Sequence, residues 1–169
     1  MNRTSTLTRH LIQAFLPFFL AVFLICLIPS SGASAKTDCQ AACAAALKAT
    51  GNSSKIKYKS VTPMDFGGFS ASAQKKTVSF MYICDAKEVY SICVAMAGNT
   101  NDAKSLLKTL KTYKNNNCSS TYLSDYSSTE QKVFKNAVCG RKGNYVWYIS
   151  MSPRKSANTK GQKALKSKL

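Results

Sequence analysis

The chain has 169 residues, of which 24 are Lys or Arg and 7 are Asp or Glu, and it contains seven cysteines and one histidine. The histidine, His10, lies in an N-terminal segment that we expect to be removed, so the mature chain would contain none. This composition excludes histidine-dependent catalytic triads, histidine metal ligands and histidine general bases from the mature protein.

Residues 1–35 have the pattern of a cleaved signal peptide. Arg3 and Arg9 precede the apolar run 11–28, and a small-residue cleavage pattern ends at Ala35. Cleavage there would leave 134 residues with 22 basic and 7 acidic side chains, a net charge of +15. We therefore expect a periplasmic or secreted protein with no membrane span after cleavage.

The mature chain has the length of a single domain and keeps six of the seven cysteines. An even number of cysteines in an exported chain of this size predicts three disulfides, and the sequence leaves their connectivity open. The close cysteine pairs of a structural zinc site do not occur, so we expect no metal and no cofactor. The predicted disulfide residues are Cys39, Cys43, Cys84, Cys93, Cys118 and Cys139.

The first element expected in chain order is a helix over residues 39–50, which Gly51 can end. Cys39 and Cys43 lie one turn apart on the apolar side of this helix. We expect each of them to pair with a different distant cysteine rather than with the other.

Three strands are expected next. Residues 55–61 alternate lysine with apolar side chains, which predicts a half-exposed strand whose outer face is all lysine. The β-branched and aromatic runs 77–84 and 89–97 are separated by a short polar segment and predict a β-hairpin.

Two further helices and a strand follow. Residues 101–116 predict an amphipathic helix with leucines on one face and lysines on the other. Ser127 and Glu130 have capping-box spacing before a third helix, expected over 128–139. Residues 144–151 predict the last strand.

The composition changes after residue 152. Residues 153–169 carry six basic side chains, no acidic or aromatic residue and few apolar ones, which predicts a disordered basic tail. Residues 36–152 are then a single disulfide-linked α+β domain, with about three helices packed on an antiparallel sheet of three to four strands.

Carboxylates are the candidate catalytic residues, because small, basic, secreted domains include glycosidases that work through two of them. Asp38, Asp85, Asp102 and Glu130 already have expected roles in helix caps or turns. Asp65, Glu88 and Asp125 remain, and they define the alternative hypothesis of a small secreted hydrolase with a carboxylate pair.

Positive charge is the strongest functional signal in the sequence. The region 36–152 has 16 basic and 7 acidic residues, and the predicted tail adds six basic residues. Excess positive charge of this kind favours affinity for polyanions. The candidate polyanion-binding residues are Lys55, Lys57, Lys59, Lys104, Lys108, Lys111, Arg141, Lys142, Arg154 and Lys155.

The leading hypothesis is a non-catalytic, exported cationic protein that binds an anionic partner: an envelope polymer, a glycan, an acidic protein or nucleic acid. Lysine outnumbers arginine 20 to 2 in the mature chain, which favours diffuse, salt-sensitive attraction over bidentate recognition. We therefore expect no sequence-specific nucleic-acid binding. A role as a secreted effector or virulence factor is compatible with this hypothesis.

Overall fold

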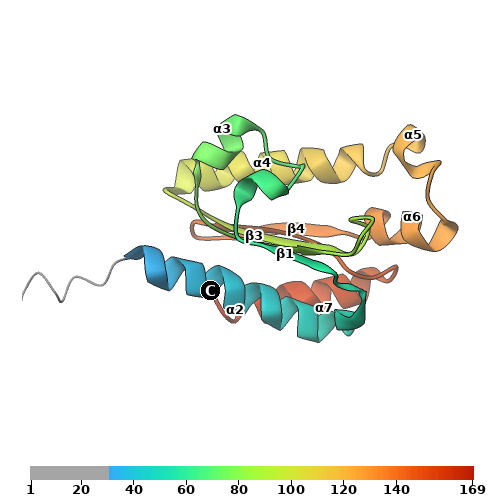
Figure 1. Cartoon of the computed structure of the whole chain (residues 1–169), viewed down its shortest axis with the longest axis horizontal. Helices are drawn as coiled ribbons and strands as arrows, with labels where there is room; N and C mark the ends of the chain where they lie inside the picture. Colours follow the sequence, from blue (N-terminus) through green and yellow to red (C-terminus); the bar gives the residue numbers. More distant parts are fainter. Residues whose placement is uncertain (1–30) are drawn as a thin grey trace, which may run out of the picture. The chain divides into compact units, whose positions relative to one another are not determined.

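A five-stranded antiparallel sheet, with strand order β1-β2-β3-β5-β4, forms the centre of an α+β fold (Figure 1). The computed structural model describes residues 31–169, of which 35–169 form one unit, so most of the predicted signal peptide lies outside the described residues. The strands are β1 (Tyr58–Ser60), β2 (Thr77–Cys84), β3 (Ser91–Ala97), β4 (Val138–Lys142) and β5 (Tyr145–Ser150). The helices are α2 (Ser31–Thr50), α3 (Ala71–Lys75), α4 (Thr100–Asn116), α5 (Ser120–Leu123), α6 (Ser128–Lys135) and α7 (Lys155–Lys166), with short 3-10 turns η1 (Ser53–Lys55) and η2 (Pro63–Asp65).

Helices cover both faces of the sheet (Figure 1). On one face, here called the α4 face, Tyr82 and Tyr148 pack with leucines of α4 such as Leu106. On the other, the α2 face, Trp147 packs with α2 and with Leu165 of α7. Because both faces are buried, the central strand β3 is buried at every position but one.

The predicted hairpin 77–84/89–97 and the amphipathic helix after it are confirmed. Strands β2 and β3 pair antiparallel, with Tyr82 opposite Cys93. Helix α4 places Leu106 and Leu110 in the core, as the apolar periodicity of the sequence requires. The predicted strand 55–61 is shorter than expected, since only Tyr58–Ser60 pairs with β2.

The predicted third helix is correct only at its start. Ser127 and Glu130 form the expected capping box, but α6 ends at Lys135 and the chain then enters β4. Gly140 lies against the Trp147 indole, where a Cβ atom would collide with the ring. The apolar periodicity of residues 128–139 predicted a helix and gave no sign of this cross-strand contact. With β4, the sheet has five strands rather than the expected three to four.

The predicted disordered tail is also wrong, because most of it forms α7. Leu165 is fully buried, and Gly161 allows α7 to approach Ala46 and Thr50 of α2 closely. The buried Asn158 side chain donates to the carbonyls of Asn136 and Ser152 and accepts from the Met151 N–H, at 2.9 to 3.1 Å. One buried amide and one glycine thus secure a helix with little apolar surface.

The six cysteines form no disulfide in the described part of the chain, and the sheet divides them. Cys39 and Cys43 lie in the core of the α2 face, whereas Cys84, Cys93 and Cys139 belong to the α4 face. Cys39 and Cys43 thus lie across the sheet from those three thiols, and their pairing with distant cysteines stays a prediction. Within residues 31–169, no helix is both long and apolar enough to span a membrane.

Replacing Leu165 by alanine should lower the free energy of unfolding by about 2–5 kcal/mol, because it removes a fully buried side chain and leaves a cavity under α7. Lys160→Ala, on the exposed side of the same helix, is the matched control and should change it by no more than about 0.5 kcal/mol. Denaturant titration of the mature chain measures both. A small, equal effect of the two substitutions would contradict the packing of α7.

Candidate functional site

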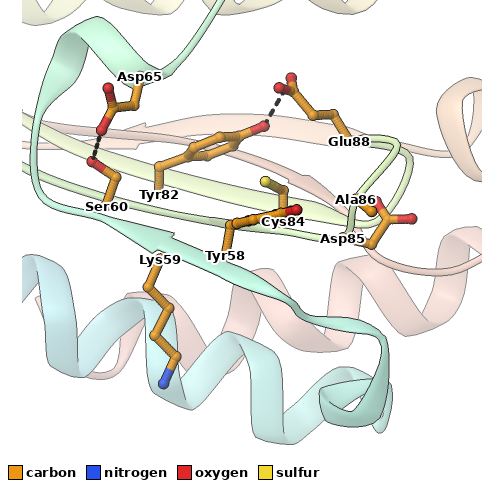
Figure 2. Close-up of a pocket in the computed structure, with 9 residues that line it drawn as sticks. All are labelled: Tyr58, Lys59, Ser60, Asp65, Tyr82, Cys84, Asp85, Ala86 and Glu88. Carbon is orange, nitrogen blue, oxygen red and sulfur yellow. Dashed lines mark hydrogen bonds between the residues drawn. The ribbon is translucent and has the colours of Figure 1, made fainter.

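A pocket of about 280 Å³ lies at the β1 edge of the sheet, where β2 ends (Figure 2). Its walls come from β1, from η2, from the end of β2 and from the turn between β2 and β3. It is lined by Tyr58, Lys59, Ser60, Asp65, Tyr82, Cys84, Asp85, Ala86 and Glu88. Figure 2 shows Lys59 pointing away from the carboxylates of Asp65 and Glu88.

Two hydroxyl groups organise the pocket. The β1–β2 register places Ser60 opposite Tyr82, so that both side chains lie on the same face of the sheet. The Ser60 hydroxyl donates a hydrogen bond to Asp65, and the Tyr82 hydroxyl donates one to Oε2 of Glu88 at 3.2 Å. The Tyr82 ring lies between the two carboxylates (Figure 2).

Burial sets the protonation of the pocket floor. Tyr82 is 3% exposed, and desolvation raises its pKa far above the usual range, with Tyr113, Cys84 and Glu88 adding to the shift. Desolvation also raises the pKa of the Cys84 thiol. Tyr82 is therefore a hydrogen-bond donor at neutral pH, and Cys84 is a protonated thiol rather than a reactive thiolate.

Glu88 is held in an unusual backbone conformation. Its φ of +56° is the only positive φ of a non-glycine residue in the described part of the chain. A non-glycine residue in this region costs of order 1–3 kcal/mol, and such strain concentrates at functional sites. The strained turn presents the Glu88 carboxylate to Tyr82.

Of the three carboxylates left without a structural role by the sequence, the pocket brings two together. Asp65 and Glu88 flank Tyr82, whereas Asp125 is exposed between α5 and α6 and does not line the pocket. Asp85 also lines it, but its Oδ1 accepts the Tyr90 N–H at 2.9 Å, in the turn role expected for it. Among residues 31–169, no group of three or more His, Cys, Asp or Glu side chains is placed to hold a metal ion.

The sequence-predicted basic residues are spread over two edges and both faces of the sheet. Lys55, Lys57 and Lys59 lie at the β1 edge, where Lys55 and Lys57 line an open hollow of about 610 Å³ that also contains Asp85 and Glu130. The lysines Lys104, Lys108 and Lys111 lie on α4, Arg141 and Lys142 lie on β4, and Arg154 and Lys155 lie at the start of α7.

A set of cations lies on β4, at the opposite edge of the sheet, and on the helices α4, α6 and α7. We call it the basic stripe, and it consists of Lys111, Lys114, Lys135, Arg141, Lys142 and Lys166. The Lys142 ammonium donates to the Lys166 carbonyl at 3.1 Å, and the Lys166 ammonium lies 5.9 Å from the centre of the Trp147 ring. The first contact connects β4 to α7, and the second connects α7 to β5.

Two thiols, those of Cys139 and Cys118, lie near lysines of the stripe. Burial raises the pKa of Cys139, on β4, to about 11, while the positive charges of Lys114 and Lys111 oppose the shift. Burial likewise raises the pKa of Cys118, and there Lys114 and Lys135 oppose it. Lys114 thus lies near both thiols.

The cations of the basic stripe form no ion pair within residues 31–169. The two ion pairs in the described residues, Lys76–Asp102 at 3.9 Å and Lys87–Glu130 at 3.5 Å, do not involve it. Near its end, Asp38 accepts the Tyr145 hydroxyl at 2.9 Å. The sequence analysis selected Lys111, Arg141 and Lys142 but not Lys114, Lys135 and Lys166. Periodicity within one helix does not show which lysines of different helices lie beside the same strand.

No family model matches this chain, and neither the curated proteins nor the solved structures that were searched contain a match to it. The pocket and the basic stripe are the two features of the described residues that bear on function.

Replacing Glu88 by glycine in a Tyr82→Phe background should raise the free energy of unfolding by about 1 kcal/mol, because glycine adopts a positive φ without strain. In this background the hydroxyl that donates to Glu88 is already absent, so the change reports on the backbone. Ala86→Gly, in the same turn but without a positive φ, is the control and should lower it by about 0.4–1 kcal/mol. Denaturant titration that ranks Glu88→Gly with Ala86→Gly would show that the turn is unstrained.

Proposed function

We propose that this protein is an exported cationic binding protein and that the basic stripe is its binding surface for an extended anionic polymer. The observation that carries the proposal is a set of cations on β4 and its neighbouring helices that form no ion pair within residues 31–169. We also propose that, as an exported binding protein, it acts as a secreted effector or virulence factor.

Electrostatics favour a polymer over a small anion. The stripe combines two cations of the edge strand β4 with cations of neighbouring helices, rather than lining a closed pocket, so several charges of one chain can bind at once. Each contact releases a counterion from the polymer, so the affinity depends steeply on salt. Since five of the six stripe cations are lysines, the expected recognition is of charge and spacing rather than of planar groups.

Neutralising Lys111, Lys135, Lys142 and Lys166 together by substitution with glutamine should weaken binding to heparin about tenfold or more near physiological salt and flatten the salt dependence of the affinity. All four side chains are exposed, so the fold should be retained. Calorimetric titration with heparin fragments at several salt concentrations measures both quantities.

The matched control neutralises four exposed lysines outside the stripe, Lys55, Lys57, Lys59 and Lys104, and has the same net charge. It should keep most of the affinity. Equal losses in the two variants would show that only net charge matters, and the stripe would then not be a binding surface.

A second candidate function, hydrolysis by a carboxylate pair, is favoured by the pocket at the β1 edge. Asp65 and Glu88 flank Tyr82, and each carboxylate accepts a hydrogen bond from a different hydroxyl. Two carboxylates in different hydrogen-bonding environments can divide the roles of general acid and of base or nucleophile. The hydrolase candidate also explains why the turn holds Glu88 at a strained φ.

If the pocket cleaves anionic glycans, Asp65→Asn and Glu88→Gln should each lower the rate about 10²-fold or more, since each removes an acid–base group. Hyaluronan and chondroitin sulfate are the probes, and release of new reducing ends is the measurement. Asp125→Asn, an exposed carboxylate outside the pocket, is the control and should leave the rate unchanged. No release of reducing ends by the unsubstituted protein would count against the hydrolase candidate for these glycans.

The proposed export also implies disulfides, because an oxidising compartment would favour bridges between the six cysteines. In this fold the sheet separates the cysteines of its two faces, which limits the pairs that such bridges could join. Cys39 and Cys43 share the core of the α2 face, Cys84, Cys93 and Cys139 share that of the α4 face, and Cys118 lies in a separate cluster.

A further inference from the structure

The outer edge of β4 is an unpaired strand edge. In the order β1-β2-β3-β5-β4, β4 pairs with β5 on one side only. Within residues 31–169, the hydrogen bonds of the β4 backbone go to β5. Because successive residues of a strand direct their backbone groups to alternate sides, a row of N–H and C=O groups faces outward from β4.

This edge suits a further strand better than the β1 edge does. Strand β4 has five residues that pair with β5 in unbroken register, and it contains no proline. Strand β1 has three residues, lies close to the 3-10 turns η1 and η2, and is followed by Pro63. An added strand on β1 would soon reach backbone that is not extended.

The basic stripe defines the charge of the occupant. A strand laid beside β4 would direct alternate side chains toward the two faces of the sheet. Lys111 and Lys114 of α4 lie on one side of β4, and Lys166 of α7 lies on the other. Acidic side chains on both faces of the added strand would therefore meet lysines.

We infer that the β4 edge binds an acidic, extended polypeptide segment, which adds to the sheet as a sixth strand. The inference rests on the proposed polyanion binding and specifies its partner. A sulfated glycan can match the charge of the stripe but cannot continue the backbone ladder, whereas a polypeptide can do both. The ladder supplies affinity that does not depend on charge.

The test compares two peptides of identical charge on the mature chain. The first repeats Glu-Glu-Val-Val, which places glutamates on both faces of a strand, and is long enough to cover β4. The second has the same sequence with every backbone nitrogen methylated. Methylation removes the N–H donors and blocks both strand edges while the side chains stay unchanged. Fluorescence anisotropy measures affinity, heparin is the non-peptide comparison, and hydrogen exchange locates the bound peptide.

The unmethylated peptide should bind at least about tenfold more tightly than the methylated one, and it should slow amide exchange in β4. The variant with Lys111, Lys135, Lys142 and Lys166 neutralised should lose affinity for both peptides and for heparin. Equal affinity of the two peptides, or protection at β1 instead of β4, would overturn strand addition even if heparin still binds to the stripe. If neither peptide nor heparin binds, the proposed function fails together with this inference.

Discussion

Burial of both faces of the sheet is the constraint on which the rest of the molecule depends. All but one residue of β3 and all but one of β5 are buried, so the centre of the sheet offers no polar or charged group that a ligand could reach. A protein with so many more basic than acidic residues must then expose its charge on outer helix surfaces and at the sheet edges. Both candidate sites lie at those edges.

The two edges of the sheet present different side chains because different elements border them. At the β1 edge, a short strand and a tight turn bring Asp65 and Glu88 to either side of Tyr82, and the result is a small concave site. At the β4 edge, the strand lies between α4 and α7 and is bordered by cations, and the result is an elongated surface. A polymer bound at one edge leaves the pocket at the other edge open.

Sequence patterns predicted the elements whose formation depends mainly on residues that are close together in the sequence. The hairpin of β2 and β3, the leucine face of α4 and the capping box at Ser127 were all predicted correctly from the sequence. Strand β4 and helix α7 were not, because their formation is decided by Gly140 against Trp147 and by Asn158 and Gly161 against distant segments. The pocket depended on strand register in the same way: Asp65 and Glu88 were selected as unassigned carboxylates, but only the pairing of Ser60 with Tyr82 places them together.

The contact of Gly161 with Ala46 and Thr50 joins the first and last helices of the described unit. The core of the α2 face is consequently completed only when segments from opposite ends of the described unit have met. Contacts of such large sequence separation require closure of a long loop before they are gained, so we expect this face to form late in folding.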